Sequence, residues 1–316
     1  MENEVIAIVM AAGKGTRMKS NKSKLVHKIY GKELVKRVYE TAQNIGSDEI
    51  IAVVGYLKDQ VIDVLQDSVK YAYQEELLGT GHAVMQAEKY LQGKSGKVLI
   101  LYGDVPLIQK ETLLKLIEKS VATKEYATVL TAHEENPFGY GRIIRDEGCN
   151  IKAIVEEKDA TDEQKKIKEI NSGIYVFDIE ELLLALKEIN NDNAQGEYYL
   201  TDVIKIMNEK GLKTGAVLVE DNDEISGVND RVQLEHLTNI LKRKINTFHM
   251  RNGVTIEDCD NIYIYDDVEI GRDTVIYPNT VIRNGVTIGR NCELGPNICI
   301  KNVSVIPDGS KIEENC

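Results

Sequence analysis

A glycine-rich turn followed by two cationic side chains is the part of the chain best suited to chemistry. Gly13 and Gly15 are separated by one residue, and Arg17 and Lys24 follow them. Glycine permits positive φ angles and lets the backbone approach a ligand closely. The amides of such a turn can bind phosphate oxygens, and the two cations can neutralise their charge. The pattern therefore predicts a binding site for a nucleoside triphosphate.

The spacing of this turn differs from two well-known nucleotide-binding motifs. No segment has the Gly-x-x-x-x-Gly-Lys-Ser/Thr spacing of a P-loop. Met18 stands where a dinucleotide fingerprint has its third glycine. A tight turn after a buried strand also explains two glycines without any ligand. The glycines alone therefore leave both interpretations open.

A second chemical group lies at the end of another apolar run, where Gly103 and Asp104 follow residues 98–102. Mg²⁺ takes one or two protein oxygens and completes its coordination with phosphate and water, so Asp104 suits this metal. The alternative is an Asp that caps the following helix, with Pro106 near the first turn. Asn229 has the same ambiguity, because Asn at the start of a predicted helix over 230–249 is a common cap.

Up to about residue 228, predicted strands alternate with predicted helices. Short apolar runs near 5–10, 50–54 and 97–102 favour buried strands. Between the first two, apolar residues repeat on one helical face. This alternation predicts a mostly parallel sheet covered on both faces, with a ligand crevice at the carboxyl ends of the strands. The residues on the helical face are Leu34, Val35, Val38, Tyr39, Ala42 and Ile45.

After residue 253, aliphatic residues recur at every sixth position. An amphipathic helix or an alternating strand does not have this period, whereas the coils of a parallel β-helix do. At about 18 residues per coil, the segment would form roughly three coils of a left-handed hexapeptide β-helix. We expect association to cover its open strand edges, and we predict a homotrimer. The repeating residues are Ile264, Ile270, Ile276, Ile282, Ile288, Leu294, Ile300, Ile306 and Ile312.

The composition of the 316-residue chain argues against several classes of protein. Its 39 basic and 51 acidic residues give a net charge of −12, which disfavours a broad nucleic-acid surface. No apolar run is long enough to span a membrane, and the N-terminus lacks the features of a signal peptide. The five cysteines include no Cys-x-x-Cys pair, which argues against a zinc site or a disulfide framework. We therefore expect a protein of the reducing cytoplasm.

Seven segments are spread, in order, over nearly all of residues 5–232. They read Ala11-Ala-Gly-Lys-Gly-Thr-Arg-Met18, Leu78-Gly-Thr-Gly-His-Ala83, Leu101-Tyr-Gly-Asp-Val-Pro-Leu107, Gly139-Tyr-Gly-Arg-Ile143, Val155-Glu-Glu-Lys-Asp-Ala-Thr161, Glu169-Ile-Asn-Ser-Gly-Ile174 and Asn193-Ala-Gln-Gly-Glu-Tyr-Tyr-Leu-Thr-Asp202. In these segments the chain resembles the bacterial N-acetylglucosamine-1-phosphate uridyltransferases, one half of bifunctional enzymes whose other half is a hexapeptide-repeat acetyltransferase. The fifth and seventh segments are the most specific to this family.

The resemblance implies a Rossmann-like nucleotidyltransferase domain over 1–228, a linker helix over 229–252 and a short β-helix over 253–316. It implies uridylyl transfer from UTP to N-acetylglucosamine 1-phosphate, with Mg²⁺ as cofactor. The metal would be bound by Asp104 and Asn229, and Arg17 and Lys24 would act on the phosphates. The other implied substrate-binding residues are Met10, Ala11, Ala12, Gly13, Gln74, Gly79 and Thr80 for the nucleotide, and Tyr102, Gly103, Gly141, Glu156 and Asn171 for the sugar phosphate.

Some residues depart from the family pattern. Ser23 and Glu33 stand where prolines are usual, which removes a backbone restraint near Lys24. Met10 replaces the more usual leucine at nearly equal volume. No histidine follows His249, whereas the family's acetyltransferase half uses a histidine base. We therefore expect this chain to lack acetyl transfer.

Three other functions remain open from the sequence. A related nucleotidyltransferase could use another sugar or base, and a hexapeptide acyltransferase is the second alternative. The third is a regulatory subunit that binds the nucleotide without turnover. At individual positions, Glu156 could be a solvated charge and Asn171 part of an ordinary turn.

Overall fold

The computed structural model describes residues 4–301 and 304–313, and the chain forms two compact units. The first unit comprises residues up to 27 together with 33–230, and the second comprises 28–32 and the residues from 231 onward. Each unit has its own hydrophobic core. The three-part domain division expected from the sequence remains a prediction.

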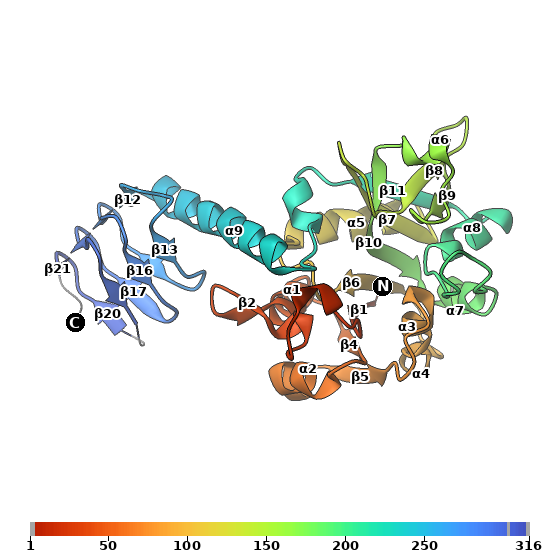
Figure 1. Cartoon of the computed structure of the whole chain (residues 1–316), viewed down its shortest axis with the longest axis horizontal. Helices are drawn as coiled ribbons and strands as arrows, with labels where there is room; N and C mark the ends of the chain where they lie inside the picture. The colour runs from red at the N-terminus through yellow and green to blue at the C-terminus, as the bar shows by residue number, and fades with distance from the viewer. Residues whose placement is uncertain (1–3, 302–303, 314–316) are drawn as a thin grey trace. The chain divides into compact units, whose positions relative to one another are not determined.

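The first unit is built on a twisted, mostly parallel sheet with the strand order β11-β7-β10-β6-β1-β4-β5 (Figure 1). Strands β6, β1, β4 and β5 are parallel, whereas β10 runs antiparallel to both of its neighbours. This arrangement confirms the predicted fold class. The strands are β1 (Val5–Ala11), β4 (Glu49–Val54), β5 (Lys70–Tyr73), β6 (Lys97–Tyr102), β7 (Ala127–His133), β8 (Arg142–Arg145), β9 (Ile151–Val155), β10 (Glu169–Asp178) and β11 (Thr214–Leu218).

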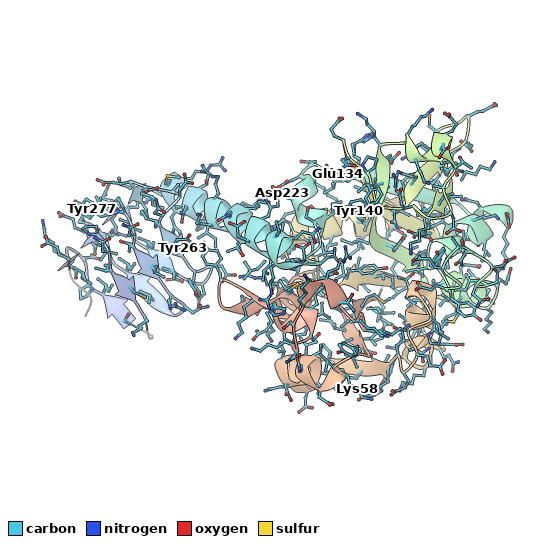
Figure 2. The ribbon with its side chains drawn as sticks, viewed as in Figure 1. Lys58, Glu134, Tyr140, Asp223, Tyr263 and Tyr277 are labelled. Carbon is cyan, nitrogen blue, oxygen red and sulfur yellow. The ribbon has the colours of Figure 1, made fainter. Side chains whose placement is uncertain are left out.

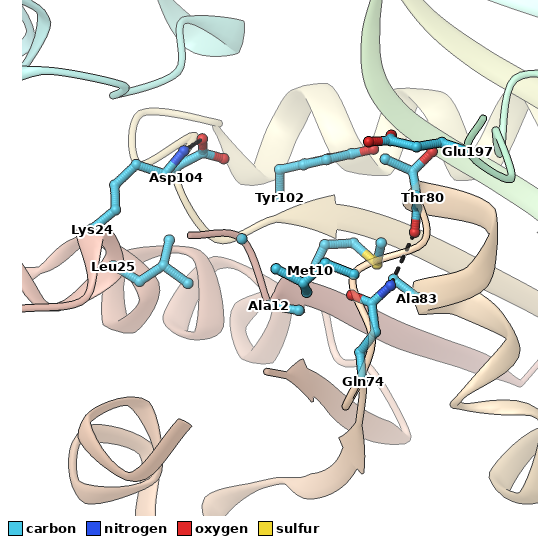
Figure 3. Close-up of a pocket in the computed structure, with 13 residues that line it drawn as sticks. Met10, Ala12, Lys24, Leu25, Gln74, Thr80, Ala83, Tyr102, Asp104 and Glu197 are labelled. Atoms are coloured by element: carbon cyan, nitrogen blue, oxygen red, sulfur yellow. Dashed lines mark hydrogen bonds and ion pairs between the residues drawn. The ribbon is translucent and has the colours of Figure 1, made fainter. Parts of the chain in front are cut away.

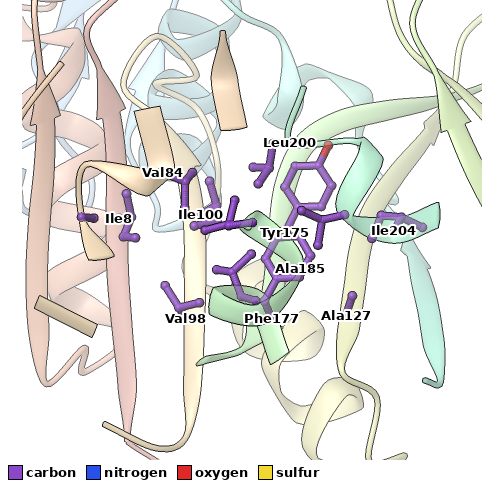
Figure 4. Close-up of a cluster of buried hydrophobic side chains, with 14 of the residues drawn as sticks. Ile8, Val84, Val98, Ile100, Ala127, Tyr175, Phe177, Ala185, Leu200 and Ile204 are labelled. Atoms are coloured by element: carbon purple, nitrogen blue, oxygen red, sulfur yellow. The ribbon is translucent and has the colours of Figure 1, made fainter. Parts of the chain in front are cut away.

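Both faces of this sheet are buried, as a parallel sheet requires. Along β1, Ile6 and Ile8 belong to one apolar cluster, and the alternate residues Ala7 and Val9 belong to the other. Helices α3, α7 and α8 pack in the first cluster (Figure 4), and α1, α2 and α5 pack in the second. The helices are α1 (Leu34–Asn44), α2 (Lys58–Leu65), α3 (Thr80–Met85), α4 (Glu88–Leu91), α5 (Lys110–Ala122), α6 (Asp162–Lys165), α7 (Ile179–Leu186) and α8 (Asp202–Glu209), and the short 3₁₀ turns include η1 (Thr16–Met18), η2 (Lys24–Val26), η3 (Gln66–Ser68) and η4 (Asn222–Ile225).

The strand register brings the ends of four strands together. Met10 pairs with Tyr102, Ala11 with Val54, and Val54 in turn with Tyr73. The loops that begin at Ala12, Gln74 and Gly103 therefore leave the sheet at the same edge. This is the carboxyl edge, at which open α/β sheets bind ligands.

The second unit begins with helix α9 (Arg231–Arg251) and continues as a coil of short parallel strands. Residues that contact each other in successive coils lie 18 positions apart, as in the hydrogen bond between Asn279 Nδ2 and Asn297 Oδ1. The predicted six-residue repeat is thus confirmed as a parallel β-helix with three faces. Its strands are β12 (Thr255–Ile256), β13 (Tyr263–Ile264), β14 (Glu269–Ile270), β15 (Val275–Ile276), β16 (Val281–Ile282), β17 (Val286–Ile288), β18 (Glu293–Leu294), β19 (Cys299–Ile300), β20 (Ser304–Ile306) and β21 (Lys311–Ile312).

A hairpin from the N-terminal part of the chain packs on this β-helix. It consists of β2 (Lys28–Ile29) and β3 (Lys32–Glu33). The ring of Tyr30 meets that of Tyr265 edge-on, with 5.2 Å between the ring centroids. Lys32 Nζ lies 3.6 Å from Asp266 Oδ2. Residues 28–32 therefore belong to the second unit, although the residues on both sides of them belong to the first.

Candidate active site

A cavity of about 290 Å³ opens at the carboxyl edge of the sheet (Figure 3). Most residues predicted to bind the nucleotide line it, together with Tyr102 and Asp104. Sequence reasoning missed Leu25, Leu77, Ala83 and Glu197, although Glu197 lies inside the motif that starts at Asn193. The predicted residues that line the cavity are Met10, Ala12, Gly13, Lys24, Gln74, Gly79, Thr80, Tyr102 and Asp104.

The glycine-rich turn shapes the entry to this cavity through two different properties of glycine. Gly15 adopts a left-handed conformation with φ +58°, and a Cβ there would lie 2.7 Å from Lys24 Cβ. Gly13 is not among the glycines with positive φ, and no atom lies within 4 Å of the place its Cβ would take. Gly15 thus uses the positive φ that glycine permits, whereas Gly13 leaves open space beside the cavity.

Ser23, which precedes Lys24, is buried and hydrogen-bonded. Its amide donates to Gln60 Oε1 at 2.8 Å, and its Oγ accepts a hydrogen bond from the Leu25 amide at 3.4 Å. A proline could make neither contact, because it lacks both the N–H and the hydroxyl. These hydrogen bonds restrain the backbone in place of the ring that the family pattern usually has here.

Lys24, Asp104 and Asn229 meet at one point. The Lys24 ammonium donates to the carboxylate of Asp104 and, at 3.2 Å, to Asn229 Oδ1. Asp104 does not cap the following helix, because α5 begins at Lys110 with Gln109 as its N-cap. The capping alternative for Asp104 is therefore wrong.

The oxygens of Asp104 and Asn229 suit Mg²⁺ as well as they suit the ammonium. Both are hard donors, and both already face one positive charge. Within residues 4–301 and 304–313, no group of three or more His, Cys, Asp or Glu side chains could hold a metal. A metal here would therefore depend on phosphate and water for its other ligands, as Mg²⁺ commonly does.

Tyr102 stands at the end of β6 between the cavity and a second group of predicted residues. Its phenol is directed toward Thr80 and Glu197 (Figure 3). Gly173 gives room for its ring, since a Cβ there would lie 2.8 Å from Tyr102 Cε2. Burial and then the Glu156 and Asp104 carboxylates raise the pKa of Tyr102, which keeps the hydroxyl protonated. The amide of the next residue, Gly103, donates to the Met10 carbonyl at 3.0 Å and ties β6 to β1.

The residues predicted to bind the sugar phosphate also come together. The Asn171 amide donates to the Gly141 carbonyl at 2.9 Å, and a Cβ on Gly141 would lie 3.5 Å from Glu156 Oε2. Thr201 Oγ1 donates to Glu156 Oε1 at 3.2 Å. Burial raises the pKa of Glu156 above its ordinary value. Glu156 is thus not the solvated charge of the alternative interpretation.

Arg17 and Ala11 are placed differently from the other predicted residues. Arg17 is exposed on η1, with no hydrogen bond or ion pair to any described residue, and it does not line the cavity. Ala11 ends β1 and is buried in the core. The structure therefore supports a contact role for Lys24 more directly than one for Arg17.

Comparison with known proteins identifies the family. The family model for nucleotidyl transferases matches residues 6–237, which include every residue of the cavity. The chain belongs to the nucleotidyl transferase family. A model for bacterial transferase hexapeptide repeats matches residues 267–302, within the β-helix.

Curated relatives of this family member extend the match beyond one domain. The chain is 55% identical over 280 residues to the Bifunctional protein GlmU of Caldanaerobacter subterraneus, covering 89% of this chain and 61% of the relative. It is 52% identical to the protein of that name from Acetivibrio thermocellus and 51% identical to that from Clostridium novyi, covering 88% and 87% of this chain and 60% of each relative. The chain therefore spans about three fifths of the length of these relatives.

Two further observations concern the predicted class of protein. In the part of the chain that the structure describes, no helix is both long and apolar enough to cross a membrane. The described cysteines, Cys149, Cys259, Cys292 and Cys299, are not joined by disulfide bonds, and Cys316 lies outside the described residues.

Proposed function

We propose that this chain transfers a uridylyl group from UTP to N-acetylglucosamine 1-phosphate and releases pyrophosphate. The meeting of Lys24, Asp104 and Asn229 beside a cavity lined by Gln74 and the glycine-rich turn is the observation that carries the proposal. The relatives' name and the seven matching segments support the choice of substrates.

The reaction needs no covalent intermediate on the protein. A phosphate oxygen of the sugar 1-phosphate attacks the α-phosphorus of UTP in line, the P–O bond to the β-phosphate breaks, and pyrophosphate leaves. The protein therefore contributes position and charge, as in phosphoryl transfer generally. Gln74, Gly79 and Thr80 bind the nucleoside, and Gly141, Glu156 and Asn171 bind the sugar phosphate.

Charge neutralisation is the second contribution of the protein. Lys24 holds a phosphate of the nucleotide, and Arg17, which is exposed on η1, neutralises the departing pyrophosphate. Asp104 and Asn229 would hold Mg²⁺, which when bound reduces the repulsion between the two phosphate groups. The Tyr102 hydroxyl stays protonated, so it adds no negative charge beside the phosphates.

Pyrophosphate release tests this proposal. With Mg²⁺ and UTP, the chain is offered N-acetylglucosamine 1-phosphate, glucose 1-phosphate and glucosamine 1-phosphate. We expect strong release with the first sugar phosphate. Asp104→Ala should lower the rate about a hundredfold or more while the fold remains, whereas the exposed Asp63→Ala should leave the rate unchanged. Equal rates for Asp104→Ala and the wild type would contradict the metal assignment, and silence with every sugar would favour the regulatory alternative.

We also propose that the chain forms a homotrimer through the β-helix. Among the described residues, the strands at the ends of the coil's sheets pair on one side only, and this and the match to hexapeptide repeats support the proposal. Sedimentation equilibrium should give three times the chain mass over a wide range of concentrations. The mass of a monomer at all concentrations would contradict the proposal.

A further inference from the structure

The side-chain amide of Gln74 is held in one orientation. Gln74 is 4% exposed, and its Nε2 lies 3.0 Å from the Gly79 carbonyl oxygen and 3.2 Å from His82 Nδ1. A carbonyl only accepts hydrogen bonds, so the atom that faces it must be the amide nitrogen. Figure 3 marks the hydrogen bond that this nitrogen donates with a dashed line. Gln74 Oε1 has no donor among the described residues and is left for the cavity.

His82 completes this arrangement only in one tautomer. A neutral imidazole has one accepting nitrogen, and Gln74 donates to Nδ1 only if the ring proton is on Nε2. Gln86 Nε2 lies 3.1 Å from His82 Nε2 and donates to the His82 carbonyl at 3.0 Å, so this amide must give up the bond to that carbonyl to turn its oxygen toward the ring proton. Gln86 is partly exposed, so its side chain can rotate and exchange the His82 carbonyl for water. Gln74 is nearly buried, so its side chain has less room to move away, and rotation would put its oxygen against the Gly79 carbonyl.

The backbone around this pair is fixed by close packing. A Cβ on Gly79 would lie 2.5 Å from the Tyr198 carbonyl oxygen, and one on Gly81 would lie 2.5 Å from Ile189 Cδ1. The Gly81 amide donates to the Tyr198 carbonyl at 2.8 Å. The loop therefore has little freedom to follow a change in the Gln74 amide, so the orientation of that amide is set by its hydrogen-bond partners.

We infer that His82 determines which base the site accepts, because its Nδ1 holds Gln74 with the amide oxygen toward the cavity. An acceptor at this place favours a base with an N–H donor on its pairing edge, as uracil has at N3. It disfavours cytosine, which presents a lone pair at N3. His82 acts through Gln74 and is a positioning residue. The inference rests on the proposed function for the identity of the nucleotide.

Two substitutions separate the accepting nitrogen from the bulk of the ring. His82→Phe keeps an aromatic ring near Tyr198, whose ring centroid lies 6.4 Å away, but removes the acceptor. His82→Asn removes the ring but places Oδ1 at the same bond separation from the backbone as Nδ1, so it can accept from Gln74. Gln86→Ala is the matched control, because it removes the hydrogen-bond partner of His82 Nε2 and leaves the contact between His82 Nδ1 and Gln74 in place.

The measurement is the Kd of UTP and of CTP for the full chain by titration calorimetry, without sugar phosphate. We expect the wild type, His82→Asn and Gln86→Ala to prefer UTP to similar degrees. His82→Phe should lower this preference about five- to tenfold, which is the size of one net hydrogen bond. If His82→Phe does not fold, as thermal unfolding would reveal, His82→Leu takes its place.

An unchanged preference in His82→Phe would overturn the inference. An equal loss in His82→Phe and His82→Asn would also overturn it, because the ring and not its acceptor would then matter. The proposed function fails separately if wild-type protein binds UTP in preference to CTP but releases no pyrophosphate with any sugar phosphate. A change in preference in His82→Phe would support the inference in that case too.

Discussion

Lys24 and Asp104 are 80 positions apart in the sequence, yet their side chains form an ion pair that Asn229 extends. Sequence patterns could identify each of these residues, because each stands in a motif or at an element boundary. They could not predict that the ammonium would lie between the two oxygens. That arrangement depends on strand register and on the close contact of Gly15 with Lys24. His82 and Leu77 were missed for the same reason, since their roles depend on side-chain direction.

The burial of Glu156 has a consequence for stability as a function of pH. Its folded-state pKa is raised, so the unfolded chain loses this proton at lower pH than the folded protein. The stabilising contribution of Glu156 to the free energy of unfolding is fully present below the ordinary carboxyl pKa, and it is lost as the pH rises through the raised pKa. Glu156→Gln should therefore make the protein more stable at neutral pH, because no charge remains to be buried.

Urea unfolding at about pH 4 and pH 8, which bracket the ordinary glutamate pKa, measures this effect. The loss of unfolding free energy between the two values should be smaller in Glu156→Gln than in the wild type. Glu118→Gln changes an exposed glutamate and should leave the loss as it is. If Glu156→Gln and Glu118→Gln give the same loss, the burial of Glu156 carries no pH dependence.

At the scale of elements, the glycine-rich turn packs against Lys24 at the start of η2. The sequence predicted β1, β4 and β6 closely, because each is a short apolar run. It did not predict that β10 enters the sheet antiparallel, since this depends on pairing with β6 and β7 far away in the chain. Nor did it predict that residues 28–32 pack on the β-helix, because Tyr30 and Tyr265 show no periodicity that links them.

Gly15→Ala should disturb this turn at its most crowded point. The left-handed backbone costs a non-glycine residue about 1–2 kcal/mol, and the new Cβ would also push against Lys24. We expect a loss of unfolding free energy of at least that size, measured by chemical denaturation. Gly13→Ala should change stability much less, because its Cβ enters open space. Equal losses in the two variants would contradict the crowding at Gly15.

Tyr265→Ala should release the hairpin from the β-helix. Tyr30 packs on this ring, and Gly31 approaches it so closely that a Cβ would lie 2.9 Å from Tyr265 Cε1. Hydrogen exchange of the amides in residues 28–32 should therefore become faster. Tyr277, another tyrosine of the β-helix (Figure 2), is not one of the tyrosines whose rings meet Tyr30, so Tyr277→Ala should leave this exchange unchanged. The same exchange rate in both variants would show that Tyr265 does not anchor the hairpin.

At the scale of the whole molecule, two separate cores imply two unfolding events. Ile100 is fully buried in the sheet, and Ile282 is fully buried in the β-helix between Ile264 and Ile300 of the adjacent coils. Each core is closed by its own elements, so a cavity in one should weaken that unit first.

Ile100→Ala and Ile282→Ala test this independence by calorimetry. Each substitution should cost about 2–5 kcal/mol in its own unit. We expect two thermal transitions. Ile100→Ala should lower the midpoint temperature of one, and Ile282→Ala should lower that of the other. A single transition shifted equally by both would mean that the chain unfolds as one cooperative body.

The 18-residue spacing between contacting side chains also limits how the gene can change in length. Thr274 Oγ1 accepts a hydrogen bond from the Cys292 amide, and Asp267 Oδ2 accepts one from the Gly285 amide, each across 18 positions. If the codons for one whole coil are removed, every later residue still lies at an equivalent position on the same face of the β-helix. A deletion out of step with the six-residue repeat turns polar side chains inward along the rest of the coil. Insertions and deletions tolerated in this segment should therefore come in whole coils of 18 residues. Ordinary surface loops, in contrast, vary in length by single residues.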